Sequence, residues 1–165
     1  MKKLALAFTA LLLSVSCMAQ EQLAFPFQGG KEIMTRFFKE NLVVSKDAAK
    51  KRLAGTAVFK FTADETGALS KIVIYYADDL ALTPFIVEAL KKSSGKWIIP
   101  NKEKVHDFIL SFSIRHNTPV TGIAEVQKSH YDFYKNSKPF VSDDQIPLNE
   151  ASLLPTVIIN YDVAQ

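Results

Sequence analysis

The stretch that decides the fold is Arg52–Tyr76, RLAGTAVFKFTADETGALSKIVIYY. In its first half, Phe59 and Phe61 alternate with polar residues, which is the pattern of a strand with one buried and one solvated face. The DETG that follows contains Gly67, which can take the positive φ of a tight turn. The second half is rich in β-branched residues. The stretch therefore predicts an antiparallel hairpin.

Residues at helical spacing lie on each side of this hairpin. Before it, the spacing predicts a helix over about Lys31–Asn41 and a further helical turn within Ser45–Leu53. After it, we expect Thr83 to cap a second helix and Pro84 to stand at its first position. Gly95 is expected to end that helix.

A third strand is expected at Phe108–Arg115, where apolar and polar residues alternate. The order helix, strand, strand, helix, strand over residues 30–116 predicts an α+β fold in two layers. Its sheet is small, of antiparallel type and of three strands or more, and two helices cover one face. Thr156–Val163 also has the composition of a strand. The sequence leaves open whether this last strand lies against the third one, lies elsewhere, or pairs with a partner.

Composition bounds the class of protein. The chain has 165 residues, of which 48% are hydrophobic, and this suffices for one compact domain. Its 20 basic residues are spread among 17 acidic ones, for a net charge of +3. A dense basic tract is absent from the sequence, so we expect no nucleic-acid partner.

The N-terminus predicts export. Residues 1–19 have a basic start, an apolar run over Leu4–Val15 and small residues before a cleavage site after Ala19, which is the pattern of a signal peptide. The alternative is cleavage before Cys17 and lipidation of its sulfur, which would attach the protein to a membrane. We expect a periplasmic or secreted protein. Residues 20–30 are expected to form a linker, residues 31–116 the domain, and residues 117–165 a C-terminal extension with an added strand.

Several motifs occur in a fixed order along residues 30–116. They are the glycine pair at residues 29–30, the hairpin with its G-T-x-V-x-F opening, and LTPFIVEALKKSSGKWIIP with its Lys-Trp-x-x-Pro end. With the third strand, which ends at Arg115, these motifs resemble the C-terminal domain of TonB-family energy transducers. The resemblance implies a periplasmic domain that grips an extended peptide of an outer-membrane transporter by adding a strand to its sheet.

The sequence also departs from that family. A typical member keeps an N-terminal membrane helix and a long proline-rich spacer, and its domain ends the chain. Here the apolar start has the features of a cleaved peptide, residues 20–30 are no spacer, and residues 117–165 follow the last matching strand. We therefore carry over the fold and not the energy-transducing role.

The expected contact surface is the edge of the sheet, because an edge strand offers unpaired N–H and C=O groups to another strand. The third strand is the candidate, with the residues Phe108, Ile109, Leu110, Ser111, Phe112, Ser113, Ile114 and Arg115. The sequence thus predicts a non-enzymatic module that binds an envelope protein or a transporter peptide. The alternatives are a structural protein that dimerises through the same edge, and a small-ligand binder that uses the extension as a lid.

No catalytic residue, metal or cofactor is expected. His106, His116 and His130 are far apart in sequence and lack metal-ligand spacing. In SHYDFYKN, His130 and Asp132 could form an acid–base pair, but aromatic packing of a lid or loop is favoured. Trp97 is expected to anchor the core, with its indole N–H on a carbonyl.

Overall fold

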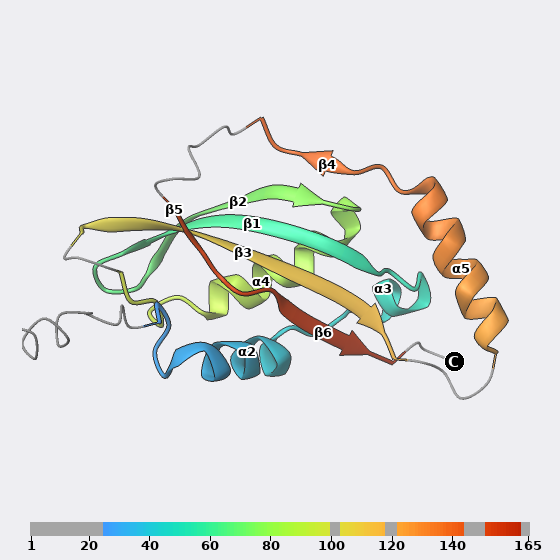
Figure 1. Ribbon diagram of the computed structural model, residues 1–165, viewed down its shortest axis with the longest axis horizontal. Coiled ribbons are helices and arrows are strands. Elements are labelled where there is room, and N and C mark those ends of the chain that lie inside the picture. Colours follow the sequence, from blue (N-terminus) through green and yellow to red (C-terminus); the bar gives the residue numbers. More distant parts are fainter. Residues whose placement is uncertain (1–24, 100–102, 118–121, 144–150, 163–165) are drawn as a thin grey trace, which may run out of the picture.

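The computed structural model describes residues 25–99, 103–117, 122–143 and 151–162. The elements are α2 (Gly30–Asn41), α3 (Lys46–Lys50), β1 (Gly55–Asp64), β2 (Leu69–Ala77), the 3₁₀ helix η1 (Leu80–Leu82), α4 (Thr83–Lys92), β3 (Val105–His116), α5 (Ile123–Asn136), β4 (Phe140–Val141), β5 (Ala151–Leu153) and β6 (Val157–Tyr161) (Figure 1). The predicted α+β class is confirmed: one mixed, largely antiparallel sheet of six strands packs with the helices. The expected signal peptide and Cys17 lie outside the described residues.

The predicted hairpin forms the centre of the sheet. β1 pairs antiparallel with β2 on one side and with β3 on the other. In the turn, Oδ1 of Asp64 accepts the N–H groups of Thr66 and Ala68 at 2.9 and 3.0 Å. Gly67 takes the predicted positive φ, +77°. The turn chemistry thus fixes where β1 ends and β2 begins.

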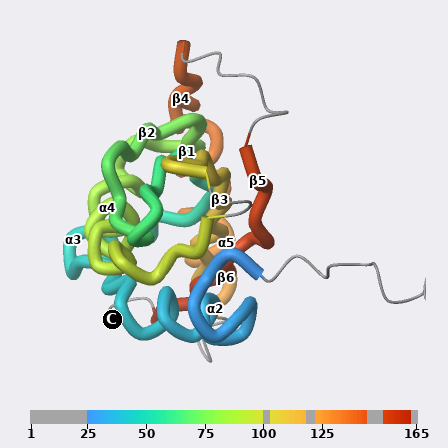
Figure 2. Tube along the Cα trace, turned by 90° about the vertical axis from the view of Figure 1, so that its left-hand side faces the viewer, coloured from blue at the N-terminus to red at the C-terminus, as the bar shows by residue number. Residues whose placement is uncertain are grey.

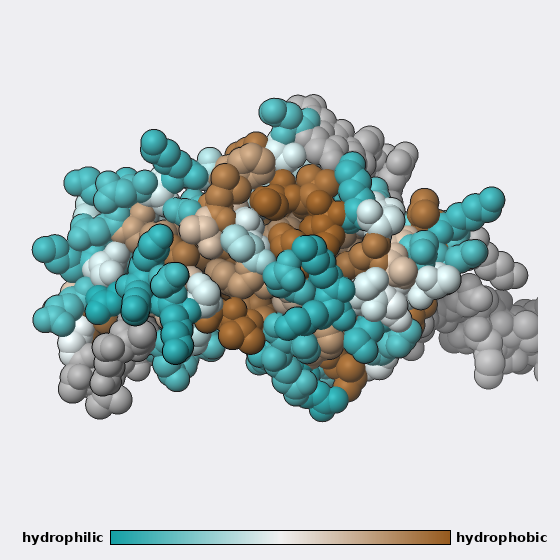
Figure 3. Space-filling model, turned by 180° about the vertical axis from the view of Figure 1, so that it is seen from behind, coloured by the Kyte–Doolittle hydropathy of each residue, from teal (hydrophilic) through white to brown (hydrophobic). Residues whose placement is uncertain are grey.

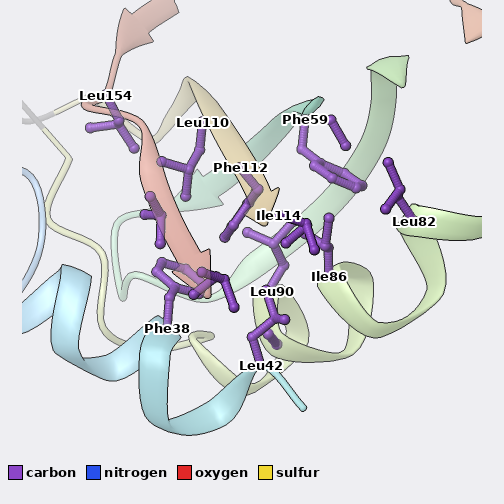
Figure 4. Close-up of a cluster of buried hydrophobic side chains, with 14 of the residues drawn as sticks. Phe38, Leu42, Phe59, Leu82, Ile86, Leu90, Leu110, Phe112, Ile114 and Leu154 are labelled. Carbon is purple, nitrogen blue, oxygen red and sulfur yellow. The ribbon is translucent and has the colours of Figure 1, made fainter. Parts of the chain in front are cut away.

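The core lies between one face of the sheet and the helices. Alternation along β1 sends Phe59 and Phe61 to this face, where both are fully buried. Helices α2 and α4 bring Phe38 and Leu90 against it (Figure 4). Figure 2 shows α3 and α4 on one side of the molecule and β5, the strand that pairs with β3, on the other. The ring of Phe38 meets that of Phe112 edge-on, 5.2 Å apart.

Trp97 anchors the end of this core. Its indole lies 4.5 Å from the ring of Phe61 and 5.0 Å from that of Phe27. The indole N–H donates to Oγ of Ser93 at 3.0 Å, so the predicted carbonyl partner is wrong. The reason is the turn that ends α4, which buries the Ser93 hydroxyl beside the indole.

The start of α4 also differs from the prediction. Thr83 is the first residue of the helix and not its cap, because η1 leads directly into α4. The capping side chain stands earlier, where Oδ1 of Asp79 accepts the N–H of Ala81 at 2.7 Å. The Thr83 hydroxyl donates back to the carbonyl of Leu80 at 2.9 Å.

The strand Phe108–Arg115 is not an open edge. On the side away from β1, β3 pairs in parallel with β5 at Asp107–Ile109 and with β6 at Phe112–His116. The predicted strand at Thr156–Val163 is β6, and it lies against the third strand. Its inward residues are buried, and the Tyr161 hydroxyl donates to the carbonyl of Leu53 at 2.7 Å. The chain itself therefore occupies the edge that the sequence offered to a partner.

Candidate functional site

On the hairpin side of the sheet, the partly uncovered edge is β2. The short strand β4 pairs with its last two residues, Tyr76 and Ala77, and the N–H of Ser142 donates to the carbonyl of Tyr75 at 3.0 Å. At the other end of β2, the N–H of Leu69 donates to Oγ of Ser94 at 3.0 Å. Between these ends, no described strand lies beside Ile72–Ile74 on the side away from β1. This stretch is a template for one more strand.

An apolar groove runs between this edge and α4. It encloses about 470 Å³ and is lined by Leu69, Ser70, Lys71, Ile72, Ile74, Val87, Lys91 and Ser94. Its apolar members are half-buried and pack against the core on one side; they are Leu69, Ile72, Ile74 and Val87. Figure 3 shows apolar surface on the face that carries α4, with hydrophilic residues around it. We name this groove and the adjoining edge the β2 groove.

Two irregularities in the β1–β2 pairing bracket the β2 groove. The register shifts between Val58 and Phe59, and again between Thr62 and Ala63. Bulges of this kind increase the local twist and interrupt a regular ladder. The regular part of the edge is therefore short, which limits the strand that can add there to a few residues.

A second candidate lies at the opposite end of the sheet, under α5. Here a cavity of about 580 Å³ separates α5 from the ends of β1 and β3. We name it the α5 cavity. It is lined by Ala54, Gly55, Thr56, Ser113, Ile114, Arg115, His116, Asn117, Ile123, Val126, Gln127, His130 and Tyr134. The predicted edge residues Ser113, Ile114 and Arg115 thus belong to this cavity.

Two ionisable groups of the α5 cavity, His116 and Tyr134, are uncharged at pH 7. Nε2 of His116 lies 2.8 Å from the carbonyl of Arg52, so this nitrogen carries the proton and donates. Burial lowers the pKa of His116, which keeps the ring neutral at pH 7. Burial raises the pKa of Tyr134, and the carboxylate of Asp78 adds to the effect. The Tyr134 hydroxyl therefore keeps its proton.

The helix α5 covers the cavity much as the lid alternative requires. The segment SHYDFYKN packs through its rings: that of His130 lies 4.8 Å from Tyr134 and 5.8 Å from His116. No hydrogen bond joins His130 to Asp132, which is exposed. The segment thus shows the predicted aromatic packing and not the acid–base pair.

A cluster of three polar side chains, those of Glu103, His106 and Ser152, joins β3 to β5. His106 contacts Oε2 of Glu103 through Nδ1 at 2.7 Å and Oγ of Ser152 through Nε2 at 2.9 Å. A serine, a histidine and a carboxylate are connected in this order in triad hydrolases. Here the carboxylate side chain is 44% exposed, so water weakens its hold on the imidazole. The plain effect of the two contacts is to fasten β5 to the start of β3.

An ion pair between a buried lysine and a partly exposed aspartate lies beside this arrangement, and the sequence did not predict it. Lys60 was expected on the solvated face of its strand, but its side chain is only 4% exposed. Its Nζ lies 2.8 Å from Oδ2 of Asp107, while Thr62 donates to Oδ1 at 2.5 Å. Burial raises the pKa of Asp107, but the bonds from Lys60 and Thr62 outweigh this and lower it. The neighbours Val73 and Ile109 cover the lysine stem.

The histidines take different roles in the structure. His106 and His116 are each committed to hydrogen bonds, and His130 packs against rings. Within the described residues, no three or more histidine, cysteine, aspartate or glutamate side chains are grouped so that they could hold a metal. The absence of a metal or cofactor therefore stays a prediction.

The resemblance to the TonB C-terminal domain rests on the sequence motifs alone. Across the described ranges, no helix has both the length and the apolar character to cross a bilayer. No protein-family model, no curated protein and no solved structure matches this chain.

Proposed function

We propose that this protein is an exported interaction module that binds an extended segment of another cell-envelope protein by strand addition. The added strand pairs with β2, and not with β3 as the sequence first indicated. The observation that carries this proposal is the β2 groove: an edge without a described neighbouring strand at Ile72–Ile74, beside an apolar channel formed with α4.

The two edges differ in what a partner would have to displace. At β3 a partner must remove β6, whose inward residues Val157, Ile159 and Tyr161 are buried in the core. At Ile72–Ile74 no described strand has to leave. Each main-chain hydrogen bond that a partner adds contributes about 0.5–1.5 kcal/mol net. Strand addition at β2 is therefore the less costly of the two.

The groove also defines the chemistry of the partner. In an added strand, side chains alternate between the two faces of the sheet. One set would lie over Ile72, Ile74 and Val87, which favours apolar side chains there. The other set would lie on the opposite face of the sheet, the face of Val73, where polar side chains are also accepted. The expected partner is a short extended segment with alternating apolar residues.

The motif resemblance and the N-terminal sequence support the rest of the proposal. The observed order of β1, β2, α4 and β3 is the order in which the TonB-like motifs occur. The signal-peptide pattern of residues 1–19 supports a partner in the periplasm or outside the cell. An energy-transducing role is not part of the proposal.

The test selects ligands from a display library of twelve-residue peptides and then scans the backbone of the best one. We expect enriched peptides with alternating apolar residues. N-methylation at successive positions is expected to weaken binding at every second residue, because alternate N–H groups of a strand point to its neighbour. Losses without this alternation, or a library that enriches nothing, would contradict strand addition.

A pair of variants locates the site. Val87→Lys places a charge in the β2 groove, whereas Val141→Lys alters an exposed residue of β4. We expect the first to weaken peptide binding at least about 10-fold, since an apolar contact is replaced by a charge. The second is expected to bind as the parent protein does. Circular dichroism confirms that both variants are folded, and equal binding by both would place the site elsewhere.

The same experiment tests the dimer alternative. Two copies that paired through β2 would join their sheets about a two-fold axis. Light scattering after size-exclusion chromatography measures this without any peptide. We expect a monomer at micromolar concentrations. If the protein is instead a dimer that Val87→Lys dissociates, the partner at the β2 groove is a second copy of this chain.

A further inference from the structure

The helix α5 rests on the sheet without a filled interface. Its sequence is amphipathic, yet none of its residues is fully buried. Ile123 and Val126 face the α5 cavity, and Phe133 is the residue that packs against the core. An interface of this kind leaves about 580 Å³ between helix and sheet. Cavities of about 300–1,000 Å³ are typical of sites for small molecules.

The α5 cavity is lined by one cationic side chain. Among the described residues that line it, Arg115 is the only one with a permanent charge, and none is acidic. Its Nε donates to Oγ of Ser113 at 3.0 Å, while no described carboxylate lies within ion-pair distance of its guanidinium. The two terminal nitrogens of Arg115 therefore remain available to an anion.

Two carboxylates beside lining residues of the cavity accept hydrogen bonds. The carboxylate of Asp78 accepts the N–H of Thr56 at 2.6 Å and the hydroxyl of Tyr76. Asp162 accepts from the side-chain amide of Asn117 at 2.7 Å. Within the described residues, neither carboxylate forms an ion pair with Arg115.

Further donors face the same space. The Tyr134 hydroxyl keeps its proton and makes no hydrogen bond within the described part of the chain. His130 lies beside it and contributes an imidazole that also lacks a described hydrogen-bond partner. A guanidinium, a phenol and an imidazole on facing elements form a set that suits a planar anion.

We propose that the α5 cavity binds a small amphipathic carboxylate. The carboxylate pairs with the guanidinium of Arg115 and accepts from Tyr134, and the apolar part lies against Ile123 and Val126. The ligand fills the gap under α5 and so holds the helix on the sheet. This site lies apart from the β2 groove and does not depend on the proposed peptide function.

The test titrates the full folded protein with phenylacetate and octanoate and follows backbone amides by NMR. The matched controls are phenylacetamide and octanamide, which have the same apolar parts and no charge. We expect saturable shifts at the α5 cavity with the acids, and binding at least about 10-fold weaker with the amides, because a charge-assisted bidentate pair is lost.

Two variants separate this site from surface charge effects. Arg115→Met keeps an apolar stem and removes the guanidinium, and Arg36→Met does the same on the exposed surface of α2. We expect acid binding to weaken about 10- to 100-fold in the first and to stay unchanged in the second. Val126→Trp, which fills the cavity, is expected to abolish binding.

Three results would overturn the proposal. They are equal binding of acids and amides, equal loss in both arginine variants, and no saturable shift at the cavity up to about 10 mM ligand. Shifts confined to the β2 groove would also count against it, because they would assign the acids to the peptide site. Failure of peptide selection leaves these readouts unaffected, so the two proposals stand or fall separately.

Discussion

The way β6 closes the sheet can be tested with two neighbouring isoleucines. Ile159 points into the core and is 5% exposed, whereas Ile158 points outward and is 39% exposed. Truncation of a buried isoleucine to alanine costs about 2–5 kcal/mol, because the lost contacts leave a cavity. The same truncation at a position with more than a third of its surface in water costs about 1 kcal/mol. We therefore expect Ile159→Ala to be less stable than Ile158→Ala by at least about 1 kcal/mol.

Urea unfolding measures this difference. The single tryptophan, Trp97, is buried in the core and reports the transition by its fluorescence. The slope of the unfolding free energy against urea is expected to be unchanged, since both variants unfold the same surface. Equal losses at the two positions would mean that β6 does not present alternate faces to core and solvent, and the description of β3 as a covered strand would fail.

The same reasoning predicts what happens when the segment after Asn117 is removed. The deletion takes away Leu154, Val157 and Ile159, which are each 5% exposed or less. At about 1.5–3 kcal/mol for each side chain, the loss is about 5–9 kcal/mol. A typical domain has a total stability of about 5–15 kcal/mol. We expect the shortened chain to lose its cooperative unfolding transition, and a folded monomer that offers β3 to peptides would refute this.

Three further outcomes are expected. Gly67→Ala destabilises the fold by at least about 2 kcal/mol, measured by urea unfolding, because φ there is +77° and a Cβ would collide with the main chain of Trp97. Asp107→Asn costs about 3 kcal/mol at pH 7, since it leaves the ammonium of Lys60 buried without its counter-ion. Folding lowers the pKa of Asp107, so its contribution to the free energy of unfolding is complete above the unfolded pKa of about 3.9 and is lost as the pH falls toward the folded pKa. Between pH 6 and pH 2, the free energy of unfolding is therefore expected to fall less in the Asp107→Asn variant than in the parent protein. Ser152→Ala is expected to lower the free energy of unfolding by about 1 kcal/mol, because one hydrogen bond is lost. We also expect that a fluorophosphonate does not label the parent protein; labelling at Ser152 would identify this residue as a nucleophile and contradict its structural role.

The sequence predicted those parts of the fold whose signals are local. The hairpin followed from the alternation around Phe59 and from the Asp64 and Gly67 turn, and α2 followed from apolar residues at helical spacing. These patterns need no knowledge of distant segments. Thr83 was assigned to the wrong position because η1 precedes α4, and one side chain does not reveal such an extra turn.

The features that were missed depend on contacts between distant segments. Alternation along β3 showed that it is a strand, but the pairing of Phe112–His116 with β6 joins segments well apart in the chain. For the same reason, Lys60 read as a solvated residue until its neighbours and Asp107 were placed around it. The α5 cavity likewise needs the position of α5 over Arg115, which periodicity cannot supply.

The parallel pairing of β6 with β3 has a consequence for the order in which the protein matures. A ribosome completes β3 at His116, and β6 begins only at Val157. During that interval β3 has no partner on the side that β6 covers in the folded protein. Strands with an unpaired edge are prone to aggregation. Chaperones that shield β3 until β6 has been synthesised are therefore expected to raise the yield of folded protein.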